Sequence, residues 1–91
     1  EQGRFLYLTA RAIGARTIVE FGTSFGISTI YLAAAVADNG GGVVVGSEIE
    51  PGKHARALDN IAAAGLAQHV DVRLGDALET LKELPAPVDM V

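Results

Sequence analysis

Segments typical of β-strands alternate with segments typical of helices along the whole chain, and this alternation limits the fold more than any other feature. The expected strands span residues 17–21, 43–49, 69–74 and 88–91, and the expected helices span residues 4–13, 26–37, 51–65 and 77–84. Strands separated by helices of this length indicate right-handed βαβ crossovers. We therefore predict an α/β fold, built as a doubly wound, mostly parallel sheet with helices on both faces.

The length of the chain bounds how much of such a fold it holds. Its 91 residues suffice for one domain at most. The last four residues, VDMV, have the character of a central strand, and a fourth strand that stopped there would leave its backbone groups unpaired. We therefore expect residues 1–91 to be the N-terminal half of a longer domain, truncated after the start of its fourth strand.

The composition indicates a globular protein whose partner is a small molecule. Apolar residues make up 49% of the chain and charged residues 20%, which is typical of a folded domain. The formal net charge is −4, and the Lys and Arg residues are scattered along the chain. Because a phosphate backbone is bound by clustered basic residues, we expect no nucleic-acid partner.

Every apolar stretch is interrupted before it reaches the length of a membrane span. The interrupting residues are Glu20, Asp38, Glu48 and Arg56. We therefore expect no transmembrane helix, no signal peptide and a soluble, cytoplasmic protein. The chain has no cysteine, and its two histidines lack the spacing of metal ligands, so no metal site is expected within these residues.

The end of the first strand is the first candidate for a ligand site, because parallel sheets of this type bind ligands at the carboxyl ends of their strands. The loop Gly22-Thr23-Ser24-Phe25-Gly26 follows that strand and leads into a helix. A side chain at Gly22 would collide with a ligand, and Gly26 lets the helix approach closely. Loop amides and the positive end of the helix dipole suit a carboxylate or phosphate, to which Ser24 and Ser28 add hydroxyl donors. An ordinary turn in which Ser and Thr cap the helix remains the alternative.

Glu20 favours the ligand interpretation of this turn. It lies in an otherwise apolar strand, where a carboxylate costs several kcal/mol unless it is paired or hydrogen-bonded. We expect it to accept hydrogen bonds from loop amides or from a ligand ammonium group.

Acids also stand at the ends of the second and third strands. Glu48 ends the second strand, where a carboxylate can accept hydrogen bonds from both hydroxyls of a ribose, whereas Glu50 is expected to cap the following helix. Asp76 and Ala77 follow the third strand, where they can meet the edge of a planar base. For Asp76, a helix N-cap without a ligand remains the alternative.

Two nucleotide-binding motifs fail on these residues. The dinucleotide fingerprint G-x-G-x-x-G requires a second glycine, and Ser24 occupies that position. A P-loop requires Gly-Lys-Ser or Gly-Lys-Thr after the turn, which this chain lacks.

Six segments together resemble the cofactor half of class I S-adenosylmethionine-dependent methyltransferases, which have a Rossmann-like fold. They are EQGRFLYLTARAIGART, VEFGTSFGISTIYLA, GSEIEP, ARALDNIAAAGL, VRLGDALETL and VDMV, and they cover nearly the whole chain. The chain is most similar to the small-molecule O-methyltransferases that include the catechol and caffeoyl-CoA enzymes and their bacterial relatives. This family often has a glycine between Gly22 and Gly26, where this chain has Ser24. Several of the O-methyltransferases also lack that glycine.

The resemblance implies a role for each matching residue in holding S-adenosyl-L-methionine. Glu20 and Gly22 would frame the methionine part, and Gly26 would close the turn onto the helix. The remaining roles concern the two ends of the cofactor: Thr23, Ser24 and Ser28 near the carboxylate, Glu48 on the ribose, Ile49 against the adenine, and Asp76 with Ala77 at the adenine edge.

The catalytic residues would lie beyond Val91 on this interpretation. In metal-dependent members of the family, the strand that begins VDMV continues to an acid that binds a divalent ion such as Mg²⁺, so Asp89 is not expected to be that ligand. The partners implied are a small-molecule methyl acceptor and, as an open alternative, a second copy in a homodimer. Two other functions stay open: an NAD-dependent oxidoreductase, which Glu48 permits and Ser24 opposes, and a non-catalytic methyltransferase-like domain.

Overall fold

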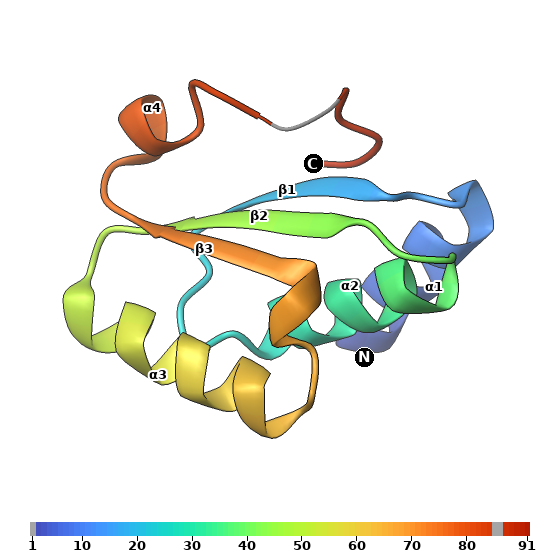
Figure 1. Ribbon diagram of the computed structural model, residues 1–91, viewed down its shortest axis with the longest axis horizontal. Helices are drawn as coiled ribbons and strands as arrows, with labels where there is room; N and C mark the ends of the chain where they lie inside the picture. Colours follow the sequence, from blue (N-terminus) through green and yellow to red (C-terminus); the bar gives the residue numbers. More distant parts are fainter. Residues whose placement is uncertain (1, 85–86) are drawn as a thin grey trace.

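The computed structural model describes residues 2–84 and 87–91 and forms a three-stranded parallel sheet with helices packed around it (Figure 1). The elements in chain order are α1 (Gln2–Ile13), β1 (Thr17–Phe21), α2 (Ile27–Asp38), β2 (Val43–Glu48), α3 (Pro51–Ala63), the 3₁₀ turn η1 (Ala67–His69), β3 (Val70–Leu74) and α4 (Ala77–Thr80). The predicted α/β class with a parallel sheet is therefore confirmed.

The carboxyl end of β1 lies where the strand order reverses, because later strands are added on both sides of β1. The three strands lie in the order β1-β2-β3. The segment predicted as a fourth strand lies on the free edge of β1, where Met90 forms an isolated parallel bridge with Ile18. Because β2 and this segment flank β1 on opposite sides, the turn after β1 stands at the topological switch point, the usual ligand position in open α/β sheets.

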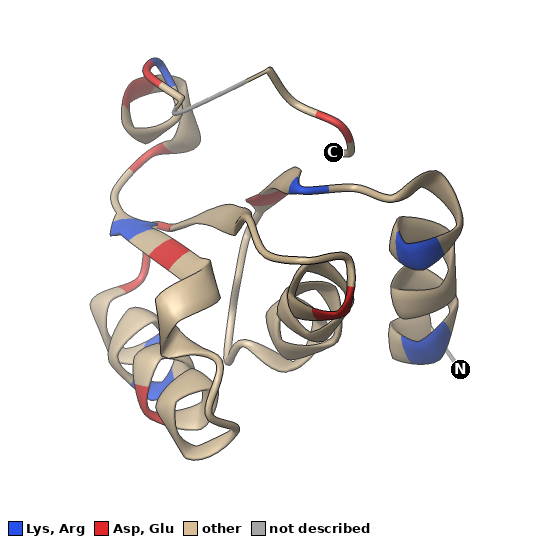
Figure 2. Cartoon of the chain, turned by 45° about the vertical axis from the view of Figure 1, so that its right-hand side comes forward, with Lys and Arg blue, Asp and Glu red and all other residues tan. Residues whose placement is uncertain are grey.

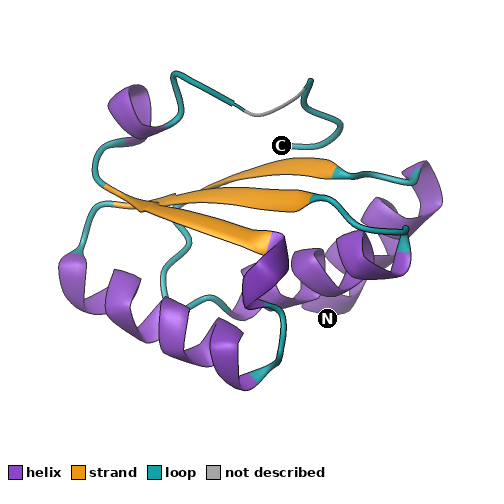
Figure 3. Cartoon of the chain, in the orientation of Figure 1, coloured by secondary structure: helices purple, strands orange, loops and turns teal. Residues whose placement is uncertain are grey.

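Three long helices share one face of the sheet. Figures 1 and 3 show α1, α2 and α3 on that face, whereas the short α4 lies on the other side. The helices predicted for both faces are thus present, but the second face of the described residues carries only one helical turn. The end of the expected helix 77–84 is wrong, because α4 stops at Thr80. The sequence also predicts that Pro85 and Pro87 terminate this helix, but Pro85 lies outside the described residues.

The core lies between the sheet and α2, which is apolar on almost every side. A cluster of fully buried residues joins this helix to α1 and the first two strands, and its members include Ala10, Ile18, Ala33, Val36 and Val44. A second cluster, Ala57, Ile61 and Val72, packs α3 against β3. The helix is buried from several directions, as its composition predicts, and both clusters brace the strand ends that form the site.

Charged residues are dispersed over several elements of the described chain, as Figure 2 shows. Lys and Arg residues lie on α1, on α3, at the sheet and after α4, and acids accompany them everywhere except on α1. No helix within residues 2–84 and 87–91 has both the length and the apolarity to span a membrane.

Candidate functional site

The carboxyl ends of the three strands border two cavities that meet at Gly22. The first cavity, of about 530 Å³, lies between the start of α1 and the turn after β1, and its lining includes Gly3, Thr23, Ser28 and Tyr31. The second, of about 220 Å³, lies between the ends of β2 and β3, and its lining is Gly22, Ser47, Glu48, Ile49, Gly75, Asp76 and Ala77. Gly22 lines both cavities, so they suit the two parts of one elongated ligand.

Gly22 has the geometry that the sequence predicts for a residue beside a ligand. Its φ is +68°, a left-handed conformation that other residues rarely adopt, and a Cβ added there would meet no atom within 4 Å. Its amide and that of Thr23 donate to the carbonyl oxygen of Ser47, at 2.9 and 3.1 Å. We expected these amides to be free for a ligand. They instead anchor the turn to β2.

Ser24 turns its amide toward Glu48 by adopting a left-handed conformation. Its φ of +56° makes it the one non-glycine residue with positive φ among those described. The Ser24 amide lies 2.5 Å from Oε1 of Glu48, and the Glu50 amide lies 3.1 Å from Oε2. Such a conformation costs a serine about 1 kcal/mol, which a hydrogen bond to a carboxylate can offset.

Glu48 is buried at the boundary of the second cavity and is held in its charged form. Its residue is only 6% exposed. Burial alone would raise the pKa of Glu48, but the amides of Ser24 and Glu50, aided by the charge of Lys53, lower it below its ordinary value of 4.5. An ionised carboxylate therefore faces the cavity at neutral pH, with lone pairs left to accept from ligand hydroxyls.

Glu20 is satisfied differently from the expectation. Its two carboxylate oxygens accept hydrogen bonds from the hydroxyls of Ser28 and Thr29, in the first turn of α2, and not from loop amides. Burial raises the pKa of Glu20, and the two hydroxyls offset that effect only in part. The loop-amide part of the expectation is wrong, because the first turn of α2 packs near β1 and its hydroxyls reach this carboxylate, whereas the contact with a ligand ammonium group stays a prediction.

The N-terminus of α2 is open toward the first cavity. Gly26 is its N-cap residue, with φ +88°, and no side chain caps this end. Ser and Thr do not cap the helix, so the turn is not the ordinary capped turn left open as an alternative. The positive end of the helix dipole thus faces the cavity and favours an anionic group there.

Gly26 itself lies outside the lining of both cavities and has a packing role. A Cβ at this position would lie 3.2 Å from the Cα of Ala57 in α3. The glycine therefore lets α2 approach α3 closely, as the sequence predicts, without contributing to the cavity wall.

The end of β3 combines a helix cap with a cavity wall. Asp76 accepts a hydrogen bond from the Leu78 amide at 2.9 Å and so caps α4, yet it lines the second cavity together with Ala77. Asp76 is therefore a helix N-cap, and its contact with a ligand stays a prediction that its place in the cavity wall permits. Glu50 caps α3 through the Gly52 amide at 2.9 Å, as predicted. Ile49, with 68% of its surface exposed, supplies the apolar wall of this cavity.

Sequence reasoning missed the contribution of α1 to the first cavity. Gln2 and Gly3 line it opposite the turn after β1. A Cβ at Gly3 would come within 2.5 Å of the Tyr31 ring, so the glycine lets the start of α1 lie against α2. A glycine near the start of an amphipathic helix was the signal that could have revealed this close approach.

Thr23 has a buried hydroxyl that no group of the described chain satisfies. Its residue is 2% exposed, and its Oγ1 has no hydrogen-bond partner within residues 2–84 and 87–91. A buried polar group without a partner costs about 1–3 kcal/mol. Thr23 lines the first cavity, but its Oγ1 is buried against β2, because a Cβ added at Gly46 would collide with it, so this hydroxyl does not face the cavity.

Asp89 is held by backbone amides. Its Oδ2 accepts from the amides of Arg16 and Thr17, at 3.0 and 3.1 Å, and these hydrogen bonds lower its pKa. The side chain thus ties the segment before Met90 to the start of β1. Within the described residues no group of three or more His, Cys, Asp or Glu side chains is placed to hold a metal ion.

Comparison with known proteins places this site in a family. A methyltransferase domain model matches residues 19–91. The chain belongs to this methyltransferase family. It is 46% identical to the catechol O-methyltransferase of Mycobacterium tuberculosis over 93 residues, covering 100% of this chain and 41% of that protein. The catechol O-methyltransferase of Niastella koreensis is 39% identical over 94 residues, covering 99% of this chain and 42% of that protein.

Solved methyltransferase structures share the same arrangement. The O-methyltransferase TomG of Streptomyces achromogenes, in complex with S-adenosylmethionine (SAM), superposes with a TM-score of 0.89 and 40% identity, covering 99% of this chain and 41% of that one. An O-methyltransferase of Bacillus cereus with S-adenosylhomocysteine (SAH) gives 0.91 and 40%, covering 98% and 42%. The chain therefore spans about two fifths of the length of the relatives it matches.

Proposed function

We propose that these residues are the cofactor-binding part of an S-adenosyl-L-methionine-dependent methyltransferase that methylates an oxygen atom of a small molecule. The observation that carries the proposal is the pair of cavities joined at Gly22, with the ionised Glu48 in one and the uncapped end of α2 beside the other. The methyltransferase domain match and the O-methyltransferase names of the relatives support the same assignment.

The residues present fit the two ends of this cofactor. The first cavity suits the amino-acid end, because the uncapped N-terminus of α2 borders it and its dipole favours a carboxylate there. The second cavity suits the nucleoside, with Glu48 accepting from the ribose hydroxyls, Ile49 against the adenine, and Asp76 with Ala77 at its edge. The cofactor would pass Gly22 at the junction of the two cavities, where a side chain would take up space that the ligand needs.

Methyl transfer needs little from these residues beyond position and charge. The bound cofactor supplies an electrophilic methyl group on a positively charged sulfur. Glu48 would contribute negative charge and hydrogen-bond acceptors in the cavity that suits the nucleoside, and the turn after β1 would border the amino-acid end. Glu20 lines neither of these cavities, and its carboxylate instead accepts hydrogen bonds from Ser28 and Thr29 in the first turn of α2. Alignment of donor and acceptor supplies most of the rate enhancement in such a displacement. The groups that activate the acceptor oxygen, including any divalent metal, are proposed to lie outside these residues.

The two alternative functions are weighed on the same features. The NAD-dependent oxidoreductase has no support beyond Glu48, since Ser24 occupies the middle glycine position of the dinucleotide fingerprint. A non-catalytic domain would bind the cofactor without turning it over. A small-molecule acceptor is proposed because the relatives include catechol and caffeoyl-CoA O-methyltransferases, and a homodimer stays a prediction.

Titration calorimetry of the full-length protein, which includes the residues proposed to activate the acceptor, with S-adenosylhomocysteine tests the proposal. We expect saturable heat with a one-to-one stoichiometry. Folded protein that gives no heat at high micromolar ligand would sink the assignment, and NADH fluorescence enhancement would favour the oxidoreductase instead. Binding together with no transfer of labelled methyl to any of a panel of catechols and hydroxycinnamates would favour the non-catalytic domain.

A further inference from the structure

The wall of the second cavity formed by α4 is held by polar side chains and not by apolar packing. This helix has four residues, none of them buried, and its Leu78 is 80% exposed. A single turn with no buried face is unstable by itself, because nucleating a helix costs more than one turn returns. Some other contact must therefore keep Asp76 and Ala77 at the cavity.

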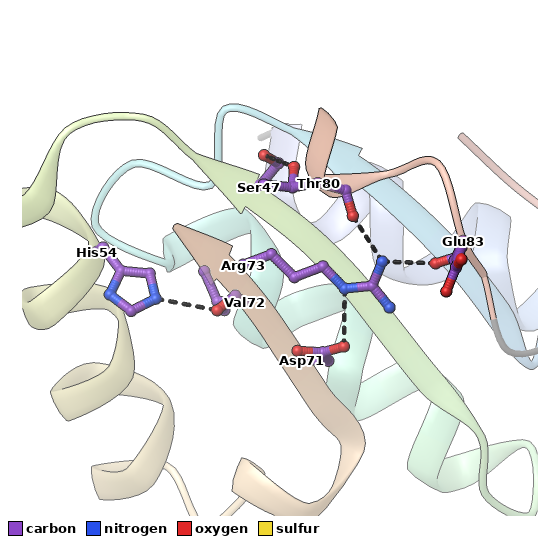
Figure 4. A network of polar contacts seen from close by, with 7 residues as sticks. All are labelled: Ser47, His54, Asp71, Val72, Arg73, Thr80 and Glu83. Atoms are coloured by element: carbon purple, nitrogen blue, oxygen red, sulfur yellow. Dashed lines mark hydrogen bonds and ion pairs between the residues drawn. The ribbon is translucent and has the colours of Figure 1, made fainter. Parts of the chain in front are cut away.

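Arg73 provides that contact, on the face of the sheet opposite to α3. Its Nη1 donates to the carbonyl oxygens of Thr80 and Glu83, both at 2.6 Å, and its Nε lies 3.0 Å from Oδ2 of Asp71 (Figure 4). The guanidinium thus joins β3 to the last turn of α4 and to the residues after it. Its donation to these two carbonyls also explains why the helix stops at Thr80.

A second set of contacts ties the same helix to the residue next to Glu48. The Thr80 hydroxyl lies 2.5 Å from the Ser47 hydroxyl (Figure 4). Ser47 also donates to the Gly75 carbonyl at 3.1 Å. Ser47 pairs with Arg73 in the register of β2 and β3. The network therefore links both strands that border the second cavity to the helix that closes it.

We propose that Arg73 is a positioning residue for the cofactor, which acts by holding α4 so that Asp76 and Ala77 line the nucleoside cavity. This inference rests on the proposed function and adds a residue that lines neither cavity. Arg73 is only partly exposed, with 26% of its side chain accessible, and its planar fork reaches three acceptors at once. A lysine has one donor group and cannot replace all three contacts.

The test compares Arg73→Gln with Lys82→Ala in the full chain. Lys82 is a matched control, since it forms an exposed ion pair with Glu79 at 3.0 Å in the same segment and does not contact the network. Affinity for S-adenosylhomocysteine is measured by calorimetry at a temperature where circular dichroism shows every variant folded. Hydrogen exchange of the Glu79, Thr80 and Leu81 amides is measured without ligand.

Arg73→Gln should weaken binding about tenfold and accelerate exchange of these amides, because a helix docked only about a tenth of the time lowers the apparent affinity by that factor. Lys82→Ala should change neither quantity. Arg73→Lys and Thr80→Val should fall between them, and they provide the test if Arg73→Gln does not fold.

Wild-type affinity in Arg73→Gln, with or without faster exchange, would overturn the inference, because a merely structural role changes stability and leaves the affinity of the folded protein intact. Absence of binding to the wild-type chain would overturn the proposed function, and the inference with it. Binding by the wild type with no difference among the variants would overturn the inference alone.

Discussion

The two cavities are walled in different ways, and the difference predicts how each responds to mutation. The turn after β1 is fixed by its own backbone, since the amides of Gly22, Thr23 and Ser24 donate to β2. The α4 wall is fixed by the side chain of Arg73 and by the Ser47–Thr80 contact. A backbone-built wall depends on conformations that few residues adopt, whereas a wall held by side chains should weaken gradually as contacts are removed.

Gly22→Ala should give the largest effect and is the strongest test of the backbone-built wall. The added Cβ enters the junction of the two cavities, and overpacking a filled site costs up to about 3 kcal/mol, so S-adenosylhomocysteine affinity should fall about a hundredfold. Calorimetry of the folded variant measures this loss.

Gly14→Ala is the matched control for backbone strain. Gly14 has φ +64° and open space around its Cβ position, as Gly22 does, but it follows α1 away from both cavities. Both variants should lose a similar free energy of unfolding, while only Gly22→Ala loses affinity. Equal affinities in the two variants would show that the junction is not occupied by ligand.

Much of this wall was predictable from sequence, because the strands are short apolar runs and parallel topology brings their carboxyl ends to one edge. That argument brought Gly22, Glu48 and Asp76 to one edge, where two adjoining cavities lie, and the family resemblance added Ile49. It did not reveal the partners of Glu20, because hydrogen-bond choice depends on which turn of α2 lies beneath β1.

The rest of the site depended on contacts between distant parts of the chain. The start of α1 reaches the first cavity only because Gly3 packs on Tyr31. The end of α4 at Thr80 depends on Arg73, which lies in β3, the strand before this helix. From the sequence alone, Arg73 looks like an ordinary exposed strand residue. Beyond the glycine at position 3, local patterns carry no signal for such packing, so the side-chain-held wall was the less predictable of the two.

Glu48→Gln should have the second largest effect, because Glu48 lines the second cavity and also accepts a hydrogen bond from the turn that borders the first. The variant keeps the shape of the side chain but removes its charge and one acceptor for the amides of Ser24 and Glu50. Hydrogen bonds to charged groups contribute about 1.5–3 kcal/mol, so the affinity for S-adenosylhomocysteine should fall roughly tenfold or more.

Glu50→Gln is the control for this change, since Glu50 caps α3 and lines neither cavity. Its affinity, measured by the same titration, should match that of the wild type. If Glu48→Gln also bound as tightly as the wild type, the assignment of Glu48 to the ribose would be wrong.

Ser28→Ala and Thr29→Val separate a ligand contact from support of Glu20. Both hydroxyls donate to Glu20, but only Ser28 lines the first cavity. If Ser28 also meets the carboxylate of the cofactor, Ser28→Ala should weaken binding about threefold more than Thr29→Val, as expected for one neutral hydrogen bond of roughly 0.5–1.5 kcal/mol. Equal losses in the two titrations would assign Ser28 to Glu20 alone.

Glu20→Gln should give the smallest effect, visible in the pH dependence of stability and not in the cavity itself. The pKa of Glu20 is raised by burial above its ordinary 4.5, so between pH 4.5 and the folded-state pKa the folded protein binds more protons than the unfolded one. The Glu20 contribution to the free energy of unfolding therefore falls as pH rises through this window. Urea unfolding at several pH values should show Glu20→Gln gaining stability relative to the wild type across the window and levelling above it. A difference that instead declined with rising pH would mean that the Ser28 and Thr29 hydroxyls outweigh burial, and that this acid is as well accommodated in the backbone-built wall as Glu48 is.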